Sequence, residues 1–96
     1  MDEAQLQREV IDLATRLNHL VFHSTDSRRD TGPGFPDLVI TGRHRTLFAE
    51  LKSATGNLST EQTRWKYALI ASGMYWTLWR PKDLANGHVE TVLHEL

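Results

Sequence analysis

The sequence predicts an α/β fold in which helices flank a mixed β-sheet. Three observations predict it: an amphipathic helical pattern opens the chain, three short strand patterns follow it closely, and a second helical pattern leads into a fourth strand. A chain of 96 residues is expected to form a single domain, residues 1–96. Hydrophobic residues make up 40% of it and charged residues 24%, values that exclude a disordered or fibrous protein.

The first helix is expected over residues 3–20, because apolar residues recur there at three- and four-residue steps: Leu6, Val10, Leu13, Ala14, Leu17 and Val21. The short apolar segment Leu20–Ser24 predicts the first strand. Residues Thr25–Pro36 are rich in Gly, Pro and small polar residues and therefore predict a loop. A loop of this length in a small domain is commonly either functional or mobile.

Residues Asp37–Thr41 and Thr46–Lys52 predict two strands of a hairpin, joined by a turn at Gly42–Arg45. After the loop Ser53–Leu58, the segment from Ser59 to Gln62 has the form of a capping box.

That capping box begins a helix expected to run to about Ser72, where Gly73 is well placed to end it in a left-handed conformation. Met74–Arg80 predicts a strand that Pro81 ends. Helical spacing of the last apolar residues, Val89, Val92, Leu93 and Leu96, predicts a short closing helix.

Composition excludes several classes of protein. With 11 Lys and Arg against 12 Asp and Glu, the net charge is −1, so a uniformly basic nucleic-acid coat is excluded and a local basic face remains possible. The chain has no cysteine, which excludes disulfides, cysteine zinc sites and thiol nucleophiles. No apolar run reaches the roughly 18 residues of a membrane span, so no membrane association is expected.

The central hairpin contains the most informative arrangement. If the turn is Gly42–Arg45, Asp37 lies directly opposite Glu50, with Cβ atoms about 4.5–5.5 Å apart. Like charges placed so closely cost stability. Strand alternation puts Lys52 on the same face as Glu50. A hard divalent cation such as Mg²⁺ would relieve the repulsion, so the hairpin predicts a metal site.

The two predicted helices add further polar groups. Glu3 lies within about 40° of the centre of the apolar stripe of the first helix, whereas Glu9 lies roughly 85° away. Glu3 is therefore favoured as a third carboxylate, with Glu9 as the alternative. Gln62 falls on the face of Trp65 and should point inward, so it can act in the cap, in the site or in both.

At these residues the sequence resembles a known family. Gly34-Phe35-Pro36-Asp37 followed by Glu50-Leu51-Lys52 is similar to the PD-(D/E)-x-K nuclease pattern. With Glu3-x-x-Leu6-Gln7 before it and Leu58-Ser59-x-Glu61-Gln62 after it, the chain resembles the VRR-NUC branch. That branch includes small stand-alone phage and bacterial nucleases related to Holliday junction resolvases. The resemblance spans residues 3–81 and implies a restriction-endonuclease-like core with the element order α-β-β-β-α-β.

The resemblance also implies a site. One or two Mg²⁺ or Mn²⁺ ions would be held by Glu3, Asp37, Glu50 and the backbone carbonyl of Leu51. Lys52 would orient the attacking water or help to deprotonate it, with Gln62 as an accessory contact. Metal coordination of this kind generates a nucleophilic water and offsets charge on the phosphorane.

The expected function is therefore that of a Mg²⁺-dependent DNA endonuclease, selective for junction, branched or flap DNA. It is expected to be a cytoplasmic homodimer in a bacterial or phage-infected cell and to need no nucleotide cofactor. Four arginines are candidates for phosphate contacts, since the guanidinium fork suits phosphate oxygens: Arg28, Arg29, Arg43 and Arg45. The alternative is an adaptor that binds nucleic acid without cutting it, and a third reading is an RNA-processing nuclease.

Overall fold

The computed structural model describes residues 1–24 and 32–96. Its helices and strands follow in the order α1 (Glu3–Arg16), β1 (Leu20–His23), β2 (Leu38–Thr41), β3 (Thr46–Leu51), α2 (Thr60–Ala71), β4 (Tyr75–Trp79), α3 (Pro81–Ala85) and α4 (His88–Glu95). The predicted α/β class, with a mixed sheet between helices and the order α-β-β-β-α-β, is confirmed. None of the helices in these two ranges is long and apolar enough to cross a membrane.

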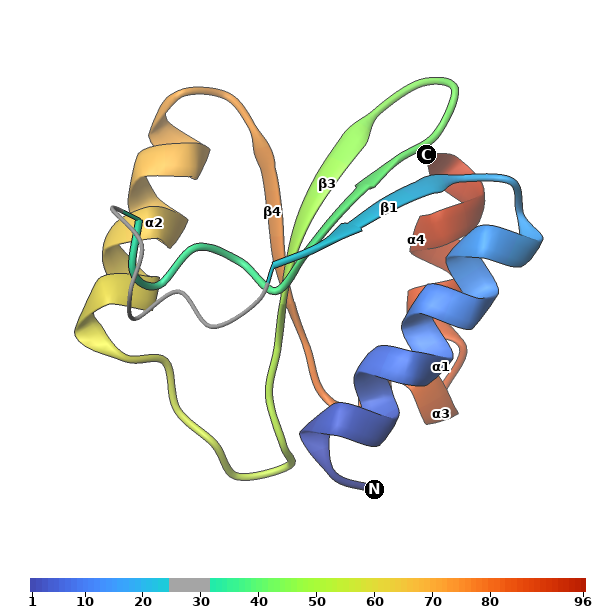
Figure 1. Ribbon diagram of the computed structural model, residues 1–96, viewed down its shortest axis with the longest axis horizontal. Helices are drawn as coiled ribbons and strands as arrows, with labels where there is room; N and C mark the ends of the chain where they lie inside the picture. The colour runs from blue at the N-terminus through green and yellow to red at the C-terminus, as the bar shows by residue number, and fades with distance from the viewer. Residues whose placement is uncertain (25–31) are drawn as a thin grey trace.

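The strands of the described residues form one sheet in the order β1-β2-β3-β4. β1, β2 and β3 are antiparallel neighbours, whereas β4 runs parallel to β3. The crossover between β3 and β4 contains α2, which lies on one face of the sheet, while α1, α3 and α4 lie on the other (Figure 1). The hairpin has the predicted register, since Leu38 pairs with Ala49 and Thr41 with Thr46 around a Gly42–Arg45 turn.

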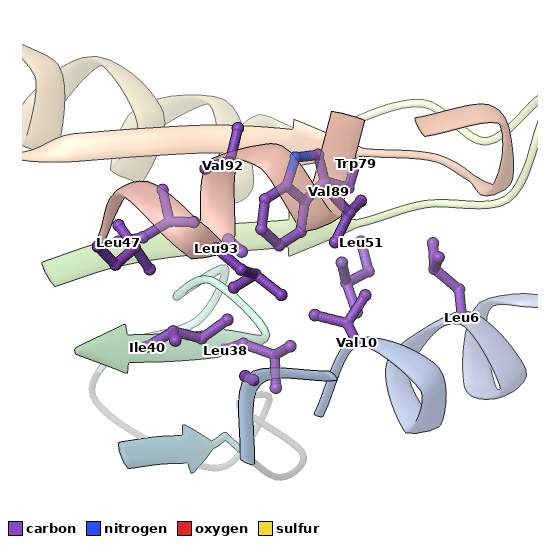
Figure 2. Close-up of a cluster of buried hydrophobic side chains, with 13 residues drawn as sticks. Leu6, Val10, Leu38, Ile40, Leu47, Leu51, Trp79, Val89, Val92 and Leu93 are labelled. Atoms are coloured by element: carbon purple, nitrogen blue, oxygen red, sulfur yellow. The ribbon is translucent and has the colours of Figure 1, made fainter. Parts of the chain in front are cut away.

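The main core fills the space between the sheet and the three helices α1, α3 and α4 (Figure 2). Alternate residues of β2 and β3 point into it, and these side chains are fully buried: Leu38, Ile40, Leu47, Ala49 and Leu51. They pack with Leu6 and Val10 of α1 and with Trp79 at the end of β4. Because side chains alternate along a strand, this packing directs Glu50 to the opposite face, where α2 lies.

α1 ends earlier than the predicted residue 20. Its first turn is capped by Asp2, whose Oδ1 accepts a hydrogen bond from the Gln5 amide at 2.8 Å. At the other end Asn18 has a φ of 63°, a left-handed conformation that asparagine tolerates better than most residues. The helix therefore stops at Arg16, and the chain turns so that Leu20 can join the sheet.

The region after β4 also differs from the prediction. Pro81 ends the strand as expected, but it is also the first residue of α3, which the sequence analysis did not predict. The fixed φ of proline suits the first turn of a helix, where its missing amide proton is not needed. The predicted closing helix is present as α4. Gly73 follows the C-cap of α2 with a φ of 85°, as the sequence predicted.

Candidate metal and catalytic site

Two carboxylates meet where β2 begins and β3 ends. Asp37 directly precedes β2, Glu50 lies in β3, and their side chains are hydrogen-bonded to each other. The backbone amide of Leu51 donates to Asp37 Oδ2 at 2.8 Å, which fixes the orientation of that carboxylate. Glu50 is only 1% exposed. The hairpin therefore holds an opposed acidic pair, and one member of that pair is buried.

Burial dominates the electrostatics of Glu50. It raises the pKa of this carboxyl from 4.5 to about 9, and both the hydrogen bond to Asp37 and the charge of Asp37 act in the same direction. The charge of Lys52 lowers the pKa of Glu50, so the ammonium acts on this carboxylate. Two adjacent acidic side chains that are costly to ionise together form an oxygen donor set suited to a hard divalent cation.

Glu3, in α1, also affects the electrostatics of Glu50. Its charge raises the pKa of Glu50, which places the Glu3 charge within electrostatic reach of that carboxyl. The Glu3 side chain is exposed, and the described residues contain no group of three or more His, Cys, Asp or Glu side chains arranged to hold a metal ion. Mg²⁺ is commonly bound through only one or two carboxylates, with waters and substrate phosphate as its other ligands. The Asp37–Glu50 pair fits that pattern.

Gln62 connects the acidic pair to the start of α2. Its side-chain Oε1 accepts a hydrogen bond from the Ser59 amide at 2.8 Å, and its own amide donates to Ser59 Oγ at 3.1 Å. The Gln62 Nε2 donates to Glu50 Oε1 at 3.2 Å. The cap that the sequence predicted is present, and the same side chain also contacts the buried acid.

The segment before Asp37 packs tightly on the first turn of α2. Gly34 has a φ of 86°, and a Cβ atom added there would lie 2.5 Å from the backbone carbonyl carbon of Glu61. The ring of Phe35 packs edge to face against Trp65, with ring centroids 5.0 Å apart. This close approach brings Asp37 and Gln62 to the same end of the sheet.

Gly34→Ala is expected to lower the free energy of unfolding by about 2–4 kcal/mol, because it adds both backbone strain and a clash with α2. Gly73→Ala is the matched control, since Gly73 also has a positive φ, 85°, but has nothing within 4 Å of an added Cβ. That control should lose about 1–2 kcal/mol, the cost of the strain alone. Denaturant unfolding of both variants checks the difference, and equal losses would contradict the close packing described for Gly34.

The two candidate arginines that the structure describes, Arg43 and Arg45, lie away from the acidic pair. Arg28 and Arg29 lie outside the described residues. Arg43 and Arg45 are exposed in the β2–β3 turn, at the opposite end of β3 from Glu50. The Arg45 guanidinium lies 4.0 Å from the centre of the Tyr75 ring, and the Arg45 amide donates to the Leu96 carbonyl. Any phosphate contact by these two residues is therefore remote from the carboxylates.

The sequence assigned no role to Ser24, which contacts the backbone of Asp37, or to Gln7 of α1. The Ser24 amide donates to the Asp37 carbonyl at 2.9 Å, and Ser24 Oγ donates to the Pro36 carbonyl at 3.0 Å, so Ser24 fixes the backbone that carries Asp37. Gln7 Nε2 lies 2.8 Å from His23 Nε2, which joins α1 to the end of β1. The signal available for Gln7 was its spacing, four residues after Glu3 on one helix face.

Comparison with known proteins identifies the fold. No family model matches the chain, and no curated protein is similar to it. Among solved structures the chain is similar to one described as a VRR_NUC domain protein, with a TM-score of 0.72 and 19% sequence identity, covering 94% of this chain and 86% of that one. The chain therefore has the fold of a VRR-NUC domain protein.

Proposed function

We propose that this protein is a metal-dependent nuclease that hydrolyses phosphodiester bonds in DNA. The observation that carries the proposal is the Asp37–Glu50 pair, in which Glu50 is buried, acted on by the charge of Lys52 and hydrogen-bonded by Gln62, in a fold shared with a VRR_NUC domain protein. Structural ion pairs place opposite charges together. Here two acids share one end of a hairpin instead, and perturbed groups of this kind cluster at functional sites.

Each residue has a distinct role in the proposed reaction. Asp37 and Glu50 would hold Mg²⁺ or Mn²⁺, with Glu3 and the carbonyl of Leu51 as further ligands. The bound ion would supply a water that is nucleophilic near neutral pH and positive charge opposite the phosphorane. Lys52 orients the attacking water and offsets negative charge on the phosphate. Gln62 fixes the orientation of Glu50 through its Nε2.

The preferred substrate is proposed to be junction, branched or flap DNA, read by its shape. The sequence contains no recognition-helix or zinc-finger motif that would read bases. A protomer only 31 Å in its longest dimension offers little surface for a four-way junction, and such a junction is close to two-fold symmetric. A homodimer would place one site on each of two opposed strands.

The outer side of α2 and the turn after it are proposed as the dimer surface. Three apolar side chains are exposed there, Tyr67 at 62%, Ile70 at 48% and, beyond the end of the helix, Met74 at 47%. Light scattering of the free protein is expected to give twice the monomer mass of 11.0 kDa. A monomer both free and bound to DNA would refute the dimer without affecting the nuclease proposal.

Cleavage of labelled four-way junction, flap and plain duplex DNA tests the function directly, in Mg²⁺, in Mn²⁺ and in EDTA. We expect metal-dependent cutting that is lost in Lys52→Ala, which excludes a contaminating nuclease. The ranking of the three substrates identifies the preferred DNA structure. Binding without cutting under every metal would favour the adaptor, and faster cutting of a matched RNA substrate would favour an RNA-processing nuclease.

Gln62→Leu is expected to slow cleavage about tenfold, because Glu50 loses a hydrogen bond that orients it. The substitution also removes the helix cap, so Ser59→Ala is the matched control: it loses a cap bond but leaves the Gln62 contact to Glu50 in place. Both variants should lose about 1 kcal/mol of stability. Single-turnover cleavage separates them, and equal rates would show that Gln62 acts only in the cap.

A further inference from the structure

The backbone around Lys52 is held on both sides. On one side the Lys52 amide donates to the Trp79 carbonyl at 3.0 Å, extending the pairing of β3 with β4 by one residue. On the other side the chain forms a turn over Ser53–Gly56, in which the Gly56 amide donates to Ser53 Oγ at 3.0 Å. Lys52 thus lies between a strand ladder and a closed turn.

One arginine side chain fastens that turn. Arg80 follows Trp79 directly, and its Nη1 donates to the carbonyl of Ser53 at 2.7 Å and to the carbonyl of Gly56 at 2.8 Å. A single guanidinium nitrogen therefore bonds both ends of the turn. Hydrogen bonds from a charged donor are stronger than neutral ones, and this side chain is half-buried, which limits competition from water.

The Ser53–Gly56 turn lies next to the side chain of Lys52. A Cβ atom added at Gly56 would lie 3.5 Å from Lys52 Cδ, so the turn lies beside the aliphatic stem with room for about one carbon atom between them. A free lysine side chain has about 2 kcal/mol of rotamer entropy, and a turn packed beside it reduces the number of rotamers that it can adopt. Loss of the turn would release this restriction.

The Arg80 side chain is not needed for the helix that it precedes. The N-terminus of α3 is capped through the backbone, since the Arg80 amide donates to Asp83 Oδ2 at 2.7 Å. Changing the side chain leaves that bond intact. The guanidinium is therefore directed across the fold, to residues 24 and 27 positions earlier in the chain.

We propose that Arg80 is a positioning residue for Lys52: by fastening the Ser53–Gly56 turn, it keeps the Lys52 ammonium directed at the Asp37–Glu50 pair. The consequence for cleavage rate rests on the proposed nuclease function, whereas the consequence for the conformation of Lys52 does not.

Arg80→Met tests the proposal, because it keeps an unbranched stem and removes the donors. With four-way junction DNA and Mg²⁺, kcat should fall roughly tenfold to hundredfold while KM is unchanged, since a small misplacement of a reacting group costs that much. Arg80→Lys, which retains a charged donor, should recover part of the rate. Lys82→Met is the control, because Lys82 is exposed, carries the same charge as Arg80 and lines one surface pocket together with it. It should leave kcat unchanged.

A second measurement needs no catalysis. In NMR spectra of the metal-free protein, the Lys52 Cε–Hε signal should move toward its random-coil position in Arg80→Met, and the Gly56 amide should exchange about tenfold faster or more. If the wild type cuts no DNA, the nuclease proposal fails and these signals still decide the role of Arg80. A folded Arg80→Met with wild-type kcat or a wild-type Lys52 signal would overturn it. If that variant does not fold, Arg80→Lys, which keeps the charge but loses the guanidinium that bonds both carbonyls, decides by the same readouts with smaller changes.

Discussion

Lys52→Ala is expected to reduce DNA cleavage by roughly 10³-fold while the fold and metal binding persist. The ammonium is the positive group that acts on Glu50, and no backbone hydrogen bond depends on it, because the Lys52 amide pairs with Trp79 regardless of the side chain. Single-turnover cleavage measures the loss, and titration with Mn²⁺ measures the retained affinity.

Asp37→Ala should behave differently from Lys52→Ala. It removes one of the two carboxylates that would hold the cation, so metal affinity should fall together with the rate. It also leaves the Leu51 amide without its acceptor. Asp12→Ala is a suitable control, because that exposed carboxylate pairs with Arg16 on the solvent side of α1. Cleavage by Asp37→Ala at the wild-type rate would show that the site has been assigned to the wrong residues.

The stability of the metal-free protein is expected to fall as the pH rises. Glu50 has a pKa of about 9 in the folded protein against 4.5 as its ordinary value, so the folded state holds a proton that the unfolded state releases between these limits. The contribution is fully present below about pH 4.5 and is lost as the pH approaches 9. The slope reaches about 1.4 kcal/mol per pH unit for one proton.

Glu50→Gln isolates this effect from the titration of other groups. The glutamine keeps the shape of the side chain but does not ionise, so the difference in free energy of unfolding between wild type and variant should change steadily from pH 5 to pH 8.5. Mg²⁺ should raise the stability of the wild type at pH 8 and leave the variant nearly unaffected. A constant difference across this range would contradict the burial of an ionisable acid at this position.

The hairpin and its acidic pair could be predicted because they depend on local rules. A turn at Gly42–Arg45 fixes the register, and strand alternation then assigns Glu50 to the face opposite the core. The capping box likewise fixes the start of α2 from Ser59 and Gln62 alone. In each case the contacts lie within a few residues or directly across a turn.

The remaining features depend on tertiary contacts that no local pattern reveals. The hydrogen bond from Arg80 to the Ser53 carbonyl requires that β4 lie parallel to β3. In the sequence Arg80 is only a basic residue before a proline, a pattern that does not predict this contact. Pro81 is compatible with both the end of a strand and the start of a helix, and packing of α3 against α1 and α4 selects the second. Arg45 is a plausible phosphate contact in sequence, but its stacking on Tyr75 depends on the neighbouring strand.

The double use of Gln62 has a thermodynamic consequence. Its side chain joins the cap of α2 to the carboxyl of Glu50, so fraying of the first helical turn and release of Glu50 are coupled events. Coupling between two equilibria is reciprocal. A cation that binds Glu50 should therefore also slow amide hydrogen exchange in the first turn of α2. Conversely, a substitution that frays this turn should weaken cation binding at the acidic pair by the same factor as that by which cation binding slows the exchange.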